Sequence, residues 1–182
     1  GAPNELIGRA QHDHPDVFIG FCGIDPWKGR AAIDEIRRCK ETYDIYGVGE
    51  LNPARQKFKP NERLFYPIWE TCAELGLIVM FHTGFAGAGA GTPGGFGYKL
   101  DYGRVIPYLD DIAADLPELK IIAAHPGWPW HLETLAAVWH KTNLFMDLSG
   151  WSPRHLPDEV RHYANALIQD RVLFGTDWPA LD

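Results

Sequence analysis

The stretch Leu77-Ile-Val-Met-Phe-His82-Thr-Gly84 ends an apolar run on a histidine, and three later stretches repeat this pattern. They are Ile121-Ile-Ala-Ala-His125, Leu144-Phe-Met-Asp147-Leu-Ser149 and Val172-Leu-Phe-Gly-Thr-Asp177. Short apolar runs of this kind are typical of buried parallel strands. Because α/β-barrel enzymes place their active sites at the carboxyl ends of strands, we expect His82, His125 and Asp177 to meet at one rim.

Strand-like and helix-like patterns alternate along the rest of the chain. Residues 17–24 and 46–51 have strand character, and apolar residues recur at helical spacing in 27–41, 61–75, 103–116, 129–141 and 156–169. This order predicts one α/β domain over residues 1–182, with a parallel sheet of six strands. A complete eight-stranded barrel usually needs roughly 200–250 residues. We therefore expect only part of such a barrel in a chain of 182 residues.

Composition and charge narrow the classes of function. The net charge is −7 and the pI is near 5.6, so neither nucleic acid nor an anionic membrane is an expected partner. Cys22, Cys39 and Cys72 form no CxxC motif, which argues against a disulfide framework or a cysteine zinc site. No apolar run has the length of a membrane span. We expect a cytoplasmic homodimer that acts on a small-molecule substrate.

Residues at four predicted strand ends suggest a metal site. His82, His125 and Asp177 offer imidazole nitrogens and a carboxylate, which are the ligands of catalytic Zn²⁺ and of similar divalent cations. Glu50 ends the strand at 46–51, where two roles fit it: a metal ligand or base at the barrel mouth, or a solvated loop residue. Asp147 fits either a functional role or the capping of loop amides.

One tempting pair of histidines is excluded. His12 and His14 form an HxH motif, which supplies two metal ligands where it ends a barrel strand. Here the motif precedes the strand at 17–24, so its side chains would lie at the wrong end of the barrel. We interpret this segment as a surface turn.

Aromatic and basic residues after the strand ends are candidates for substrate binding. Trp128, Trp151 and Trp178 either wall a pocket for a flat substrate or pack between loops. Arg154 either pairs with a substrate carboxylate or forms a salt bridge at the rim. The glycine-rich stretch 84–97 lacks the lysine and hydroxyl of a phosphate-binding loop, which favours a mobile lid over the site.

Four segments together resemble the second amidohydrolase family, which contains metal-dependent hydrolases and decarboxylases with a TIM-barrel fold. They are "PIWETCAELGLIVMFHTG", "LPELKIIAAHPGWPW", "NLFMDLSG" and "DRVLFGTDWP". The similarity covers nearly the whole chain. It implies an α/β fold, the (β/α)8 TIM barrel, with the six strands as the third to the eighth. The first two strands and the last helix would then lie outside this sequence, in a longer protein, because an open six-stranded sector leaves two unpaired edges.

The resemblance also implies roles for the site residues. By it, His82 is a metal ligand, His125 is a ligand or a catalytic group, and Asp177 is both a ligand and the proton-transfer residue. The family's first-strand His-x-His pair has no counterpart here. Many members carry lysine or histidine where this chain has Glu50, which leaves the metal count open. The expected cofactor is Zn²⁺, with Mn²⁺ and Co²⁺ as alternatives.

Three functions follow from these expectations. The first is hydrolysis of a small cyclic ester, lactone or amide by a metal-activated water, with Asp177 moving the proton and His125 stabilising the oxyanion. The second is non-oxidative decarboxylation of an aromatic or unsaturated carboxylic acid in the same pocket. The third, from a different class, is a non-catalytic barrel fragment that serves as a binding module and holds no metal.

Overall fold

A parallel sheet of six strands forms the centre of the molecule in the computed structural model, which describes residues 2–179. The strands lie side by side in chain order: β1 Phe21–Cys22, β2 Gly47–Leu51, β3 Ile78–His82, β4 Ile121–Ala124, β5 Leu144–Asp147 and β6 Val172–Leu173. Every adjacent pair is parallel, which confirms the predicted order. Residue 1 and residues 180–182 of the predicted domain lie outside the described residues.

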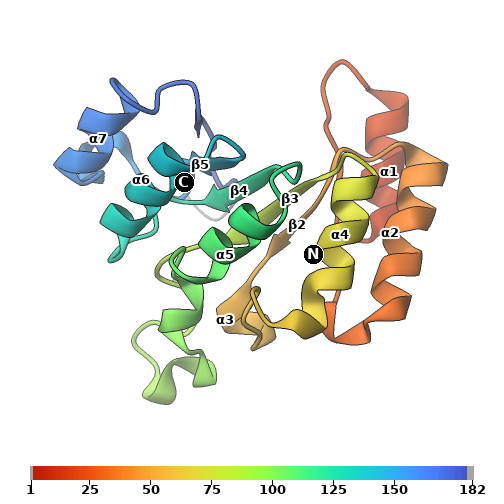
Figure 1. Cartoon of the computed structure of the whole chain (residues 1–182), viewed down its shortest axis with the longest axis horizontal. Coiled ribbons are helices and arrows are strands. Elements are labelled where there is room, and N and C mark those ends of the chain that lie inside the picture. Colours follow the sequence, from red (N-terminus) through yellow and green to blue (C-terminus); the bar gives the residue numbers. More distant parts are fainter. Residues whose placement is uncertain (1, 180–182) are drawn as a thin grey trace.

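Helices precede the first strand and connect the strands that follow. The α-helices are α1 Asn4–Asp13, α2 Arg30–Tyr43, α3 Pro53–Gln56, α4 Tyr66–Glu74, α5 Tyr108–Asp115, α6 His131–His140 and α7 Asp158–Ala164. The 3₁₀ helices are η1 Pro26–Lys28, η2 Arg63–Phe65, η3 Pro93–Gly97, η4 Leu100–Gly103 and η5 Pro153–His155. Figure 1 shows α1, α2 and α4 at one end of the molecule and α6 and α7 at the other. None of the helices in residues 2–179 has the length and apolar character needed to cross a membrane.

The core lies between the helices and one face of the sheet. In β3, Val79 and Phe81 are fully buried, and the Phe81 ring contacts Trp69 of α4 edge to face at 5.1 Å between centroids. Ile78 and Met80, on the opposite face, are only partly buried. The sequence predicted burial on both faces for this strand. The inner face is more open because the described sheet does not close on itself.

The edges of the sheet differ from the sequence prediction. The strand predicted at 17–24 is reduced to β1, and Val17 and Ile19 are each 67% exposed. In place of a ladder, Gln11 of α1 accepts a hydrogen bond from the Gly20 amide at 2.6 Å, so α1 holds this part of the run. Helices α1 and α3 were not predicted. The predicted helices 103–116 and 156–169 shorten to α5 and α7.

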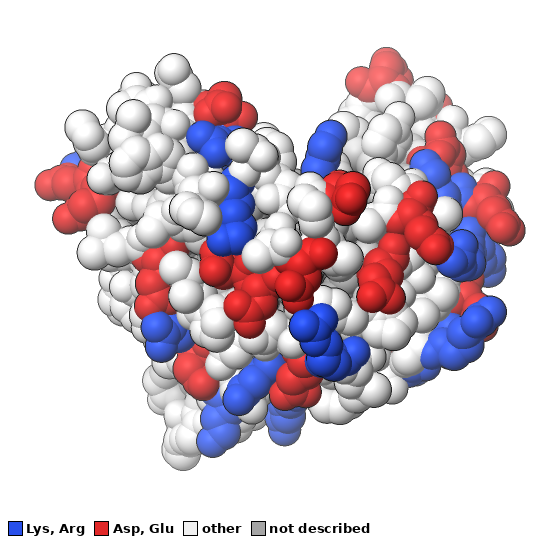
Figure 2. Space-filling model, in the orientation of Figure 1, with Lys and Arg blue, Asp and Glu red and all other residues white. Residues whose placement is uncertain are grey.

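The surface carries mixed charge around a hollow. Figure 2 shows this face hollowed between the part that carries α6 and α7 and the part that carries α1 and α2. Basic and acidic residues are interspersed on the face shown, without a continuous basic stripe. The exclusion of nucleic acid remains a prediction from net charge.

Candidate metal centre

The register of the two central strands brings two histidines together. In the β3–β4 pair, His82 lies opposite Ala124, and His125 is the next residue along the chain. The Thr83 hydroxyl donates to the Ala124 carbonyl at 2.8 Å and fixes the segment after β3. The two imidazole rings consequently lie 4.7 Å apart between centroids, in an edge-to-face arrangement.

A bulge in β2 aims a carboxylate at the same point. The β2–β3 register shifts between Val48 and Leu51, so Glu50 leaves the regular ladder. Gly49 is required at this bend, because its φ is +138° and an added Cβ would lie 2.5 Å from the Met80 carbonyl oxygen. Glu50 Oε1 is 2.7 Å from His82 Nδ1 and 3.7 Å from His125 Nε2.

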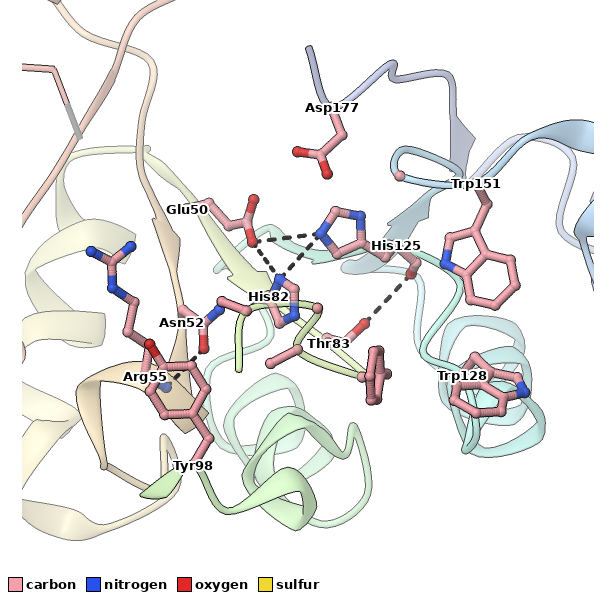
Figure 3. Close-up of a pocket in the computed structure, with 15 residues that line it drawn as sticks. Glu50, Asn52, Arg55, His82, Thr83, Tyr98, His125, Trp128, Trp151 and Asp177 are labelled. Atoms are coloured by element: carbon pink, nitrogen blue, oxygen red, sulfur yellow. Dashed lines mark hydrogen bonds and ion pairs between the residues drawn. The ribbon is translucent and has the colours of Figure 1, made fainter. Parts of the chain in front are cut away.

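Glu50, His82 and His125 therefore form one cluster (Figure 3). Each offers a ligand atom, and these atoms all lie within 4.8 Å of one another. His82 Nδ1 and His125 Nε2 are 3.1 Å apart. Among the described residues this is the only group of three or more His, Cys, Asp or Glu with that spacing.

The loop after β5 fixes the orientation of His125. Its Nδ1 lies 2.9 Å from the Ser149 carbonyl oxygen and 2.9 Å from the Ser149 hydroxyl, which itself donates to Asp147 Oδ1. Both neighbours accept, so Nδ1 carries a proton, and Nε2 is the nitrogen that presents a lone pair to the cluster when the ring is neutral. Asp147 also accepts from the backbone amides of His125 and Ser149, so it has the loop-capping role.

The electrostatics of the cluster couple Glu50 to His125. For both groups burial is the largest single influence on the pKa and disfavours the charged form. The hydrogen bonds and charges that the groups exchange outweigh burial. The pKa of Glu50 is lowered to about 2 by the two histidines. The pKa of His125 is raised to about 9 by Glu50, the Ser149 carbonyl and Asp147.

The donor set fits a divalent cation. Two imidazole nitrogens and one carboxylate oxygen are a known ligand set for catalytic Zn²⁺. The same set, with the remaining coordination positions open, also binds other first-row divalent ions. Ligand atoms about 2.0–2.1 Å from a tetrahedral Zn²⁺ lie roughly 3.4 Å apart, close to the separations here. The His82 nitrogen that faces this donor set is Nδ1, whereas Nε2, on the other side of the ring, is buried without a hydrogen-bond partner among the described residues.

Asp177 faces the cluster from the edge of the sheet. Figure 3 shows its carboxylate directed toward Glu50 and His125, although it is not one of the three clustered residues. A Cβ added to Gly150 would lie 3.0 Å from His125 Nδ1 and 3.2 Å from Asp177 Oδ2, and the φ of +73° would strain any other residue here. Asp177 and His125 both adopt a positive φ, 60° and 73°. Such backbone strain is concentrated at functional sites.

The cluster lines a cavity of about 520 Å³. Trp128 and Trp151 form part of its wall, together with Phe85 from the glycine-rich segment. Arg154 and Trp178 do not line it: Arg154 is exposed in η5, and Trp178 is 81% exposed. The structure thus brings together six of the eight predicted site residues and leaves these two apart.

Four polar residues that line this cavity were not predicted as site residues, and one of them, Thr83, directly follows His82. Asn52 and Arg55 come from β2–α3, and Tyr98 follows η3. The signal for the first two was present, because Asn-Pro directly after a strand is a helix start that keeps the next residues at the strand's carboxyl end. Nothing in the sequence pattern indicates Tyr98.

Two curated proteins are similar in sequence to nearly the whole chain. A 2-keto-4-carboxy-3-hexenedioate hydratase from Sphingobium sp. is 26% identical over 204 residues, covering 97% of this chain and 57% of the relative. A 2-amino-3-carboxymuconate-6-semialdehyde decarboxylase from Dictyostelium discoideum is 24% identical over 202 residues, covering 97% and 55%. The chain spans just over half the length of these relatives.

Solved structures establish the fold. An uncharacterized TIM-barrel protein from Bordetella bronchiseptica superposes with a TM-score of 0.74 at 24% identity, covering 98% of this chain and 60% of that one. A manganese-bound 5-carboxyvanillate decarboxylase from Novosphingobium aromaticivorans gives 0.69 at 21% identity, covering 97% and 59%. The six strands are therefore part of a TIM barrel, as predicted. The model of the amidohydrolase family matches residues 1–182, so this chain belongs to the amidohydrolase family.

Proposed function

We propose that this chain carries most of the active site of a metal-dependent enzyme that acts on an unsaturated or aromatic carboxylic acid. The observation that carries the proposal is the cluster of Glu50, His82 and His125 at the carboxyl ends of three adjacent strands, in a cavity with aromatic walls. The family match and the two curated relatives support it.

Non-oxidative decarboxylation is the reaction that we place first. Hydrolysis of a lactone or amide was the first expectation from the sequence, but one named relative is a decarboxylase, the other is a hydratase, and neither is a hydrolase. The flat faces of Trp128, Trp151 and Phe85 suit a planar, conjugated substrate. Hydration of an unsaturated acid is the second candidate, because the 26% identical relative is a hydratase.

The residues of the cavity have separate proposed roles in this reaction. Glu50, His82 and His125 hold the divalent cation, which when bound supplies Lewis-acid polarisation of a substrate oxygen. Asp177, across the cavity, delivers a proton to the carbon that loses CO₂. The carbon–carboxylate bond breaks, its electron pair forms the new C–H bond, and Asp177 takes a proton back from water. The aromatic walls orient the ring and limit access of water.

Metal analysis of the complete natural protein tests the cation site. We expect about one divalent ion per chain, lost in His82→Ala and retained in His131→Ala, since His131 lies on α6 and does not line the cavity. The analysis also decides between Zn²⁺, Mn²⁺ and Co²⁺, and the bound manganese of the structural neighbour supports Mn²⁺. Full metal content in His82→Ala would contradict the assignment.

Product analysis tests the reaction. The metal-loaded protein is incubated with 5-carboxyvanillate and 2,6-dihydroxybenzoate, and CO₂ release is measured. The Asp177→Asn protein is expected to keep the metal, and its rate of CO₂ release should fall by about 100-fold or more, which is the size of effect expected when a general acid is removed. CO₂ release that persists after Asp177→Asn, or after removal of the metal, would contradict this division of roles. The cytoplasmic location and the homodimer stay predictions.

A further inference from the structure

One cationic side chain faces the candidate metal cavity without an acidic partner. Arg55 is the only Lys or Arg among the described residues that line this cavity. Seven of the ten arginines have a carboxylate within 4.0 Å, but Arg55 has none among the described residues. Figure 3 shows its guanidinium on the side of the cavity opposite Trp128 and Trp151. A planar guanidinium with free donors is suited to bind a carboxylate through two hydrogen bonds.

The backbone under Arg55 is held by a network of hydrogen bonds. Asn52 Oδ1 accepts from the Arg55 amide at 2.9 Å, and the Asn52 amide donates to Gln56 Oε1 at 2.8 Å. Gln56 Nε2 then donates to the Ile24 carbonyl at 3.0 Å, and Trp27 Nε1 donates to the Gln56 carbonyl at 2.8 Å. These contacts tie α3 to the segment after β1. Their effect is to fix the position from which the guanidinium extends, as a binding subsite requires.

The Asn52 side chain and the charges near Arg55 also favour a carboxylate ligand. The Asn52 side-chain NH₂ makes no hydrogen bond to another described residue and lines the same cavity as Arg55. Glu50 also borders this part, but its charge is engaged by His82 and His125. Glu50, Asn52 and Arg55 also form the wall shared with a neighbouring cavity of about 710 Å³.

We propose that Arg55 and Asn52 form a carboxylate-binding subsite at the end of the cavity away from Trp128 and Trp151. The inference rests on the proposed function, because it takes the Glu50–His82–His125 cluster as the reactive end. It specifies the substrate class: a planar acid with two carboxylates, one that reacts at the cluster and one that Arg55 holds. Arg154, which the sequence suggested for this role, does not line the cavity.

A pair of isosteric probes tests the subsite. Benzene-1,3-dicarboxylate and its monoamide, 3-carbamoylbenzoate, differ in one carboxylate only. Their affinities for the complete, metal-loaded protein are measured by calorimetry. We expect the dicarboxylate to bind about 10- to 100-fold more tightly, as charge-assisted hydrogen bonds to arginine allow. Arg55→Gln should bring the ratio of affinities close to one, because the dicarboxylate loses more affinity than the monoamide, and Arg55→Lys should give an intermediate ratio.

Controls separate this subsite from the alternatives. Arg30→Gln removes an arginine that pairs with Asp34 on the surface and should leave the ratio unchanged. The subsite is refuted by three results: equal affinities for the wild-type protein, a preference that survives Arg55→Gln, or a preference lost in Arg154→Gln instead. Metal content, measured on the same samples, tests the proposed function separately. A protein that holds one ion but shows no preference between the probes would therefore refute the subsite and not the metal centre.

Discussion

The central strand β3 and the edge strand β1 are held by different kinds of contact. β3 has a strand on each side, and its Val79 and Phe81 side chains lie in the apolar core. Among the described residues β1 pairs with β2 alone, and side chains of α1 bond the backbone on either side of it. Gln11 Oε1 accepts from the Gly20 amide at 2.6 Å, and Asn4 bonds both the amide and the carbonyl of Gly23.

The proposed cation ligands and the proposed proton-transfer residue lie on strands that are paired differently. Two of the three clustered residues, His82 and His125, extend from the fully paired centre of the sheet, and Glu50 from the strand beside it. Asp177 follows the two-residue edge strand β6, where Phe174 is 87% exposed. Within the described residues, the cation site is therefore anchored by paired strands, whereas the proposed proton-transfer group follows a strand that is paired on one side.

The largest effect is expected from a matched pair of phenylalanine substitutions. Phe81→Ala removes a ring that is fully buried against Trp69 and should lower the free energy of unfolding by about 3–5 kcal/mol. Phe174→Ala removes a ring that the described residues leave 87% exposed and should change it by no more than about 0.5 kcal/mol where no further residue covers the ring. Urea denaturation of the complete protein measures both. A loss at Phe174 as large as at Phe81 would mean that residues beyond those described cover this edge.

A smaller loss is expected from the polar contacts of β1. Gln11 is 6% exposed and bonds the Gly20 amide and the carbonyls of Tyr43 and Asp44. Gln11→Ala leaves these groups without partners and should lower the free energy of unfolding by about 1–3 kcal/mol. Exchange of the Gly20 amide with solvent, followed by mass spectrometry, should accelerate more than exchange in β3. An unchanged Gly20 exchange rate would show that α1 is not what holds this edge.

The same contrast explains which parts of the fold the sequence predicts. The strands β3, β4 and β5 lie within apolar runs that were recognised directly, because core packing imposes a continuous pattern on neighbouring residues. Helix α1 is joined to the backbone around β1 by polar side chains. The Gln11–Gly20 hydrogen bond spans 9 positions of the sequence, and the Asn4–Gly23 hydrogen bond spans 19. Such polar pairs leave no periodic trace in the sequence.

The candidate site follows the same rule. His82 and His125 were predicted to lie together because the carboxyl ends of adjacent parallel strands meet at one edge. The role of Glu50 stayed open until the bulge in β2 was seen, since a register shift has no sequence signature beyond a glycine such as Gly49. Arg154 was a candidate because it lies in the loop after Ser149, and Arg55 was not considered, but it is Arg55 of α3 that lines the cavity.

The alkylation rates of three buried thiols measure how often the structure around each one opens locally. Cys22 lies on β1, Cys39 on α2 and Cys72 on α4, and burial is the main cause that raises the pKa of each, to about 11 for Cys39 and about 12 for Cys72. Since the thiolate is the reactive form, native alkylation at pH 8 requires local opening. We expect Cys22 to react several-fold faster than Cys72 by peptide mass spectrometry. Equal rates would show that edge and centre open together.

The smallest effect is expected from a carboxylate that braces the β1 edge. Hydrogen bonds from Arg38, and then from Asn4, lower the pKa of Glu35 to about 2, against the opposing influence of burial. Because the folded pKa lies below the ordinary value of 4.5, this stabilisation is complete above pH 4.5 and disappears as the pH falls toward 2. Glu35 is partly exposed, so Glu35→Gln should cost no more than about 1 kcal/mol at pH 7 and nothing near pH 2. Chemical denaturation across pH 2–7 measures the difference, and a cost that does not change with pH would assign the effect to packing instead of charge.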